Sequence, residues 1–577
     1  MTLRTSLSLV FAFSLTACAT TPQQTVRLEG VENLNFGGRG TVSAADPRAQ
    51  AAGEAILAQG GNAVDAAIAV MLALTVVEPQ SSGIGGGGFM VLGERDGDVT
   101  TYDGRETAPA GAGPDWFLNE DGSLPSFDQS VLSGLSVGVP GNLALAAKAH
   151  EERGSLAWSE LFKPAIALAR EGFVVNPRFN QSLSGNPERG GASAFGRATF
   201  YDAGGMAMPV GVKIVNDELA ETLERVGTLG ASHFYEGQYA DKLAATVAAE
   251  TQNAGAMTAE DVSSYEAKER GAVCGDYRGY RVCGMGPPSS GGVAVIQILG
   301  QLERFDLAQL GVRNPVTWHL FAESQKLAYA DRELYLADDD YVTVPVAGLV
   351  DPAYLASRSA LIAADDTITS ASAGVPAGAP QALADGNEPP ESGTSHFAVV
   401  DAGGTMVSYT STVEGPFGSG ITFGGFYLNN ELTDFSRSPE VDGKLVANRV
   451  EGGKRPRSSM APTVVYAPDG RPFLAIGAAG GATIPVQTAR AIIGIIDFGL
   501  PVKEALGLPF VMSYGDRLLV EKGTWLESEQ EALRALGHRD IVAASPPLKA
   551  GAVHWNGERW VAARDPRLDG LVEVPLR

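Results

Sequence analysis

The sequence predicts an α+β protein in which β-sheets are covered by helices. Apolar residues recur at helical spacing over several long stretches before residue 335. After Thr394 the pattern changes to short alternating strands joined by tight turns. Because a sheet and a helix each bury one apolar face against another element, this order of segments favours a layered body.

The helical segments of the first half are bounded by capping and breaking residues. Residues 46–77 have a helical pattern in which Asn62 is the expected cap, and Pro79 lies just beyond its end. A second helical region at 139–172 is expected to break at Gly154 and Pro164. The other segments expected in this half are strands at 89–92 and 99–102 and helices at 217–226, 239–254, 291–307 and 316–331.

A composition change separates the two halves. Residues 374–391 are rich in Ala, Gly, Pro and acidic residues and have no period, which predicts a loop open to cleavage. Beyond it we expect hairpins at 396–413, 464–476 and 551–563 and a helix at 486–498.

Composition and motifs exclude several classes of function. The net charge of −24 argues against a nucleic-acid partner, since no basic patch could dominate such a field. Six scattered histidines without an H-E-x-x-H motif predict no metal site. The glycine run at 83–88 lacks the Lys-Ser/Thr of a phosphate-binding loop, and no acidic ribose partner is placed for a dinucleotide, so no cofactor is expected.

The N-terminus predicts export. Residues 1–17 carry an early arginine and a short apolar run, typical of a secretory signal peptide. The ending at 15–18 resembles a bacterial lipobox, in which Cys18 is lipidated and residues 18–45 form a tether. The alternative is a plain signal peptide cut near Ala17 or Ala19. We expect a periplasmic protein, held to a membrane only through this lipid, with the outer membrane favoured because Ala19 follows the cysteine.

The two other cysteines flank a hairpin-like segment. Cys274 and Cys283 enclose eight residues that include two Gly, an Asp and two Tyr. An exported compartment permits a disulfide here, and free thiols are the alternative. No histidine lies nearby, so the spacing is poor for zinc.

Thr394 is the strongest candidate nucleophile. It begins a strand directly after the loop, so a cut between Gly393 and Thr394 would place a hydroxyl and a free α-amine on one residue. An α-amine has a reference pKa of about 7.7–8.0, which suits a general base. The plain alternative is an ordinary strand-leading threonine. A G-x-S-x-G pattern at 134–138 offers a rival nucleophile, but only a weak strand precedes it.

Many motifs accompany Thr394 in a fixed order. They lie at 60–67, 82–90, 105–109, 287–292, 394–397, 409–412, 417–420, 428–436, 455–463 and 477–481. Together they resemble the γ-glutamyltransferase (γ-glutamyltranspeptidase) family of N-terminal nucleophile hydrolases over nearly all of residues 46–568. The resemblance implies a four-layer αββα sandwich whose precursor cuts itself into a large chain, 46–393 after its leader, and a small chain, 394–577, that stay interlocked.

The resemblance also implies roles for individual residues. Thr394 would attack its own upstream peptide and later the substrate, with Thr412 supporting its hydroxyl. The oxyanion would be bound by backbone N–H groups of Gly480 and Gly481. The substrate would be glutathione or a related γ-glutamyl compound, and the acceptor water, an amino acid or a peptide. The donor's charged end would be held by Arg105 at its carboxylate, with Ser458 and Ser459, and by Glu431 and Asp434 at its ammonium.

Two departures from the family pattern bear on specificity. Glu414 stands where described members have asparagine, and it could still accept from an ammonium. The stretch 436–457 is short and has no tyrosine where some members carry a lid, so a more open site is expected. Glutaryl or cephalosporin acylases on the same scaffold are the alternative function, and an inactive binding lipoprotein is the non-enzymatic one. Retained Glu431 and Asp434 favour a γ-glutamyl donor over the first.

Overall fold

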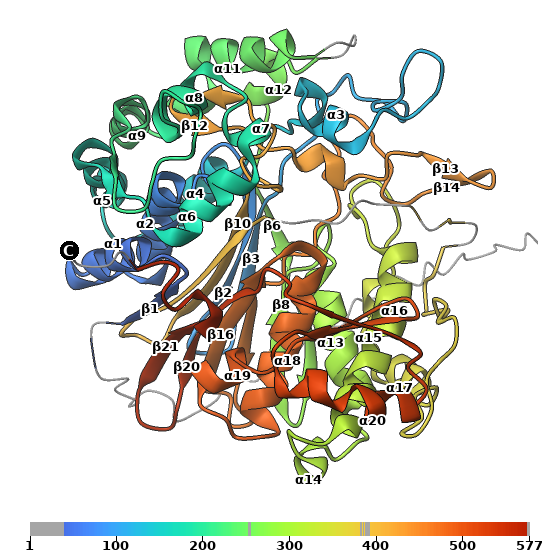
Figure 1. Cartoon of the computed structure of the whole chain (residues 1–577). Helices are drawn as coiled ribbons and strands as arrows, with labels where there is room; N and C mark the ends of the chain where they lie inside the picture. Colours follow the sequence, from blue (N-terminus) through green and yellow to red (C-terminus); the bar gives the residue numbers. More distant parts are fainter. Residues whose placement is uncertain are drawn as a thin grey trace, which may run out of the picture. The chain divides into compact units, whose positions relative to one another are not determined.

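The computed structural model describes residues 38, 40–251, 256–380, 383–384, 386 and 393–573. The expected signal peptide, Cys18 and most of the tether lie outside these residues. Helices and strands are mixed throughout, as expected of an α+β protein (Figure 1). Among the described residues, no helix combines the length and the apolar character needed to cross a membrane.

One six-stranded sheet contains the strand that follows Thr394. Its order is β1 (Thr41–Ala44), β9 (Ser395–Val400), β10 (Met406–Thr412), β2 (Gly87–Gly93), β3 (Val99–Gly104) and β6 (Lys268–Gly271). All neighbours are antiparallel, and the predicted β9–β10 hairpin is confirmed. The tether was expected to reach residue 45, and this boundary is wrong because β1 pairs along β9 and completes the sheet edge.

A second six-stranded sheet lies against the first. Its order is β21 (Trp560–Arg564), β20 (Lys549–Trp555), β16 (Pro472–Ala479), β15 (Thr463–Tyr466), β8 (Tyr280–Gly284) and β7 (Val273–Tyr277). It contains both remaining predicted hairpins, β15–β16 and β20–β21. Cys274 and Cys283 face each other across β7 and β8 and form the expected disulfide.

Helices cover the first sheet on one side. They are α1 (Pro47–Ala58), α2 (Ala63–Val77), α4 (Asn142–Arg153) and α5 (Trp158–Glu171), at the upper left of Figure 1. Helix α2 is buried on every side because α1 and α5 pack on it and β9 lies beneath it. Its predicted cap is confirmed, since Asn62 and Asp65 form a capping box. The break expected at Pro164 is wrong, because α5 continues through that proline.

A second set of helices packs with the other sheet. It comprises α13 (Gly291–Leu302), α15 (Pro315–Tyr335), α18 (Ile484–Ile496) and α19 (Val502–Leu506), in the lower half of Figure 1. The two sheets touch through β9, β10, β16 and β20, and the side chains between them, which include the polar His396, Ser408 and Thr410, form a buried interior. Thr394 lies at the end of β9 that enters this interior, where it can meet loops from both sheets.

The remaining elements lie around these layers. The helices are α3 (Phe127–Val131), α6 (Pro177–Gly185), α7 (Pro187–Gly190), α8 (Ala194–Phe200), α9 (Asp217–Leu229), α10 (Ser232–Tyr235), α11 (Gly237–Ala249), α12 (Ala259–Ser263), α14 (Leu307–Leu310), α16 (Val346–Leu349), α17 (Pro352–Ser359) and α20 (Gln530–Ala535). The strands are β4 (Phe173–Val174), β5 (Lys213–Ile214), β11 (Thr422–Phe423), β12 (Phe426–Tyr427), β13 (Glu440–Val441), β14 (Lys444–Leu445), β17 (Val511–Tyr514), β18 (Arg517–Glu521) and β19 (Asp540–Ala544).

Candidate active site

Seven of the predicted site residues line one small pocket. Its cavity is about 10 Å³, which is room for about one water molecule. Its walls come from segments far apart in the sequence, around the ends of β3, β9 and β10. The lining residues are Arg105, Thr394, Thr412, Glu414, Glu431, Asp434, Ser458 and Met460.

Thr394 is fixed by contacts on both its backbone and its side chain. Its backbone N–H donates to the carbonyl of Ser81 at 3.1 Å. Its hydroxyl donates to the Thr412 hydroxyl at 3.2 Å, and the same Thr412 oxygen accepts from the backbone N–H of Glu414 at 2.8 Å. The predicted pairing of the two threonines is therefore present in the structure, and both are buried.

The backbone around Thr394 is strained and crowded. Thr394 has φ +93°, a left-handed conformation that is rare for a β-branched residue. Glu414, which faces it, has φ +72°. A Cβ placed on Gly393 would lie 1.6 Å from the Glu414 carbonyl oxygen, so only glycine fits at that position. Strain of this kind costs about 1–3 kcal/mol per residue and is typical of functional sites.

Arg105 is held by the two carboxylates that were expected to bind the donor's ammonium. Its guanidinium pairs with Glu431 and, at 2.5 Å, with Asp434. It also donates to the carbonyls of Pro456 and Arg457. Burial alone would lower the pKa of Arg105, but Glu431 and Asp434 raise it, so it stays charged. A donor carboxylate must therefore compete with Glu431 and Asp434 for Arg105. The resemblance to a known family assigned Arg105 to the carboxylate and the two acids to the ammonium, and did not predict this competition.

Glu106 is a site residue that the sequence reasoning missed. It follows Arg105 in the 105–109 motif, of which only the arginine was given a role. Its side chain is fully buried and lies beside Glu431. Burial raises its pKa to about 8, and the positive charge of Arg105 opposes that rise. The raised pKa favours the protonated form of Glu106, which adds no charge beside Glu431.

Three predicted residues lie outside the pocket lining. The hydroxyl of Ser459 accepts from Arg332 at 2.6 Å, while its neighbour Ser458 does line the pocket. Gly480 and Gly481 form the turn after β16, with φ of +121° and +58°. Both glycines are therefore in a conformation that suits glycine, but the pocket as it stands does not reach them.

The segment in place of a tyrosine lid forms an exposed hairpin. Strands β13 and β14 project from the rest of this region in Figure 1, and Val446 bridges to Ala384. The more open site expected from a short lid is not seen in the continuous chain, because Thr394 is 5% exposed and Met460 completes the pocket wall.

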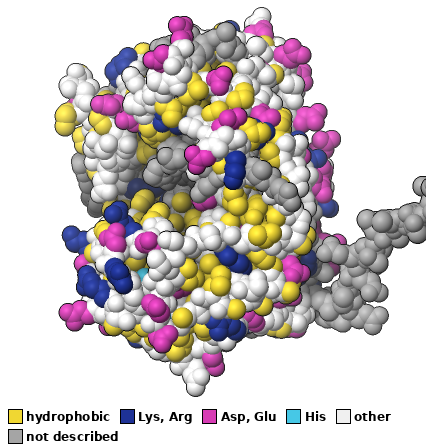
Figure 2. All heavy atoms as spheres, turned by 90° about the vertical axis from the view of Figure 1, so that its right-hand side faces the viewer, with side chains coloured by type: hydrophobic (Ala, Val, Ile, Leu, Met, Phe, Trp, Pro, Cys, Tyr) yellow, Lys and Arg dark blue, Asp and Glu magenta, His cyan; other side chains and the backbone are white. Residues whose placement is uncertain are grey.

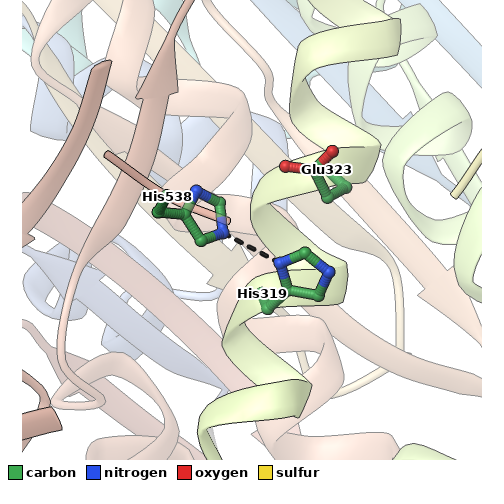
Figure 3. A group of neighbouring side chains, drawn as sticks. All are labelled: His319, Glu323 and His538. Atoms are coloured by element: carbon green, nitrogen blue, oxygen red, sulfur yellow. Dashed lines mark hydrogen bonds between the residues drawn. The ribbon is translucent and has the colours of Figure 1, made fainter. Parts of the chain in front are cut away.

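One buried group has residue types that could bind a metal ion. His319 and Glu323 lie one turn apart on α15, and His538 faces them from the loop between α20 and β19 (Figure 3). His319 Nδ1 lies 2.8 Å from His538 Nε2, and its other nitrogen contacts the Ala363 carbonyl. Burial, with His319 and Lys326 nearby, lowers the pKa of His538 to about 3.

These side chains already have partners within the protein. Lys326 pairs with Glu323 at 2.8 Å, and the backbone N–H of Ile368 donates to the other oxygen of Glu323. A cation would have to displace both the contact between the two rings and this ammonium, so the group is better explained as a structural link between α15 and the α20–β19 loop. Sequence motifs could not have found it, since His538 is 219 residues from His319.

The surface seen in Figure 2 is of mixed charge. Asp and Glu side chains are spread over this face and Lys and Arg side chains lie among them. Hydrophobic side chains gather around a hollow near the middle of the view. Among the residues coloured by type in that view, no continuous basic surface is present.

The comparisons with known proteins agree with the geometry. The profile of the gamma-glutamyltranspeptidase family matches residues 49–574. A glutathione hydrolase proenzyme of Bacillus subtilis (strain 168) is 38% identical over 487 residues, covering 83% of this chain and 81% of that protein. An acylase ACY 1 proenzyme of Pseudomonas sp. (strain V22) is 35% identical over 522 residues, 89% of each protein. The crystal structure of a cephalosporin acylase from Bacillus halodurans matches with a TM-score of 0.79 at 27% identity, covering 91% of this chain and 93% of that one.

Proposed function

The chain belongs to the gamma-glutamyltranspeptidase family and is an enzyme of γ-glutamyl transfer and hydrolysis. From this we propose that it cuts itself before Thr394 and then acts on glutathione and related γ-glutamyl compounds. The observation that carries the proposal is the pocket itself. It gathers a buried threonine pair, one guanidinium and three carboxylates at a single point.

Cleavage begins with the hydroxyl of Thr394. Its oxygen attacks the carbonyl carbon of Gly393, the peptide C–N bond breaks, and the hydroxyl proton is transferred to the leaving nitrogen, which becomes the free α-amine. Water then hydrolyses the ester and leaves a carboxylate on Gly393 and a free N-terminal threonine. The left-handed φ of Thr394 supports this step, because cutting the bond releases the constraint on that angle. Thr412 supports it by holding the attacking oxygen.

Turnover uses the same oxygen with a new base. The freed α-amine of Thr394 accepts the hydroxyl proton as the oxygen attacks the donor's γ-carbonyl carbon. The amide C–N bond breaks, the leaving amine takes that proton, and a γ-glutamyl ester remains on Thr394. Water or an amine acceptor then resolves the ester. Gly480 and Gly481 are the proposed oxyanion donors, each backbone N–H being worth about 2.7–4 kcal/mol in such sites.

The charges of the pocket match a γ-glutamyl group. Arg105 and the Ser458 hydroxyl would bind the α-carboxylate, while Glu431, Asp434 and Glu414 would surround the α-ammonium. Glu414 already accepts from the side-chain amide of Asn430, which fixes its direction. The two β-sheets and their helices would form the αββα sandwich of this enzyme class, interlocking residues 46–393 with 394–577.

A glutaryl or cephalosporin acylase is the second candidate, favoured by the two acylase relatives. A glutaryl donor lacks the ammonium, so it would leave Glu431 and Asp434 without a new cation. The test compares release of aniline from γ-glutamyl and glutaryl anilides, with Thr394→Ala as the inactive control. Faster release from the glutaryl substrate would reverse the assignment, and no release from either, in a chain that stays uncut on a denaturing gel, would refute both.

We also propose export and lipid anchoring through Cys18. The lipobox-like ending at 15–18 supports this proposal. Cys18→Ser should move the protein from the detergent-extracted membrane fraction to the soluble periplasmic fraction. Equal fractionation of both proteins would instead favour a plain signal peptide.

A further inference from the structure

A buried ion pair lies directly behind the nucleophile. Lys549 Nζ is 2.8 Å from Glu78 Oε2, and both side chains are at most 5% exposed. The hydroxyl of Ser395, the residue after Thr394, donates to the same Glu78 oxygen at 2.5 Å and accepts from Lys549 at 2.9 Å. The three side chains thus form a closed triangle in which one corner is the neighbour of Thr394.

The other end of Lys549 is tied to the turn proposed to hold the oxyanion. Lys549 is the first residue of β20 and pairs across the sheet with Ala479, the residue before Gly480. Its backbone N–H donates to Gln487 Oε1 at 3.2 Å. The side-chain amide of Gln487 in turn donates to the Ala479 carbonyl and to Thr483, whose hydroxyl donates to the Gly480 carbonyl.

Glu78 is linked to the nucleophile by a second route. Its other oxygen pairs with Arg178 at 2.8 Å, and Arg178 also donates to the Ser81 hydroxyl at 3.4 Å. The carbonyl of Ser81 is the acceptor for the backbone N–H of Thr394. Thr394 is therefore held from both sides by segments that meet at Glu78.

We propose that Lys549 and Glu78 are positioning residues, which fix Thr394 relative to the Gly480–Gly481 turn through Ser395 on one side and β20 on the other. The inference rests on the proposed function, since it assigns the turn to the oxyanion. Neither residue touches the pocket. They act by fixing the distance between the Thr394 hydroxyl and the turn, because a reacting group displaced by about 1 Å can lower the reaction rate about 100-fold.

The contacts among Glu78, Lys549 and Ser395 depend on the charges of the first two. Burial would raise the pKa of Glu78, but Arg178 and Lys549 lower it to about 2. Burial and Arg178 lower the pKa of Lys549 to about 8, while Glu78 opposes that change. The other charged or titratable groups near Lys549 are Asp46 and the neutral, buried His396. Below about pH 8 the pair is ionised, and above it Lys549 loses the proton that binds it to Glu78.

The test uses two variants and a matched control in the full-length protein. Lys549→Met removes the charge, and Ser395→Ala removes the link to Thr394 while leaving the ion pair. Lys326→Met is the control, because Lys326 forms a buried pair with Glu323 of the same 2.8 Å length but does not line the pocket. For each variant we would measure cleavage on a denaturing gel, then kcat and KM on a γ-glutamyl anilide per cleaved molecule, from pH 6 to 10.

Lys549→Met and Ser395→Ala should each lower kcat by about 10- to 100-fold, while KM stays within about threefold of the wild-type value. Each should also slow self-cleavage by a similar factor. If deprotonation of Lys549 loosens the pair, wild-type kcat should fall above about pH 8, and Lys549→Met should lack that fall. Wild-type kcat in Ser395→Ala would overturn the proposal, as would an equal loss in Lys326→Met or a loss confined to KM. If the wild type itself is inactive on γ-glutamyl anilides, the proposed function fails first, which separates the two outcomes.

Discussion

Replacing Gly393 by alanine tests whether self-cleavage depends on the close approach of the scissile bond to Glu414. The new Cβ would lie 1.6 Å from the Glu414 carbonyl oxygen, whereas Cβ contacts essentially never fall below 3.0 Å. The backbone must therefore separate by roughly 1.4 Å at the bond to be cut. Because a displacement of about 1 Å can cost about 100-fold in rate, we expect cleavage to slow by at least that factor, which corresponds to about 2.7 kcal/mol.

The assay follows the precursor that is not cut before Thr394 on a denaturing gel over time after purification. Gly113→Ala is the matched control, because a Cβ at Gly113 meets nothing within 4 Å. Thr394→Ala is the negative control, because it lacks the attacking hydroxyl and should not cleave at all. A thermal melt of each protein shows whether Gly393→Ala still folds, since overpacking of this kind costs about 1–3 kcal/mol of stability.

Cleavage of folded Gly393→Ala at the rate of Gly113→Ala would refute the reasoning. It would mean that the uncut backbone does not hold Gly393 against Glu414 during the reaction. Slow cleavage with an unchanged melting temperature would be the strongest support, because strain would then act on the reaction and not on the fold.

Three further outcomes are expected. Asp434→Asn removes one of the two carboxylates on Arg105 and a partner for the donor's ammonium, so KM for a γ-glutamyl anilide should rise about tenfold or more, equivalent to about 1.4 kcal/mol. The pKa of Glu106 is about 8 in the folded protein and about 4.5 in the unfolded chain, so the unfolded chain loses this proton at lower pH and the stability of the wild type falls between those pH values. The melting temperature of Glu106→Gln should therefore match that of the wild type near pH 5 and exceed it near pH 8. A difference in melting temperature that stays constant with pH would contradict this. Reducing the Cys274–Cys283 disulfide, or replacing both residues by serine, should lower the free energy of unfolding by about 2–3 kcal/mol in a urea titration, with no change in cleavage.

Local pattern was enough to predict the hairpins, whereas most of the pocket residues were identified through the resemblance to a known family. Alternation and turn residues located the β9–β10 hairpin, and the capping signal at Asn62 located the start of α2. Thr394 could be singled out because a composition change ends at its own position. β1 was missed because it is four residues long and becomes a strand only by pairing with β9, which is more than 350 residues away.

Which charged side chains pair with each other was harder to predict than which residues lie in the site. The family resemblance implied that Arg105 binds the donor's carboxylate and Asp434 its ammonium, but not that the two side chains pair with each other. Glu78 and Lys549 carry no motif, and their pairing spans 471 residues. Such contacts depend on how the two sheets pack, and buried charges pair with whatever opposite charge the fold brings within reach. Sequence patterns report local structure and cannot contain that information.

The uncut chain cannot already have the geometry needed for turnover. On the proposed mechanism the same hydroxyl attacks both carbonyls, so the carbonyl of Gly393 would have to leave before a donor's γ-carbonyl could take its place. The pocket holds about one water molecule, too little for a γ-glutamyl group. Cleavage would therefore do three things at once: create the α-amine base, release the strained φ of Thr394, and free the space beside Glu414 that Gly393 occupies. Because Ser395 and the Lys549–Glu78 pair lie on the other side of Thr394, they can keep the nucleophile in place while that space opens.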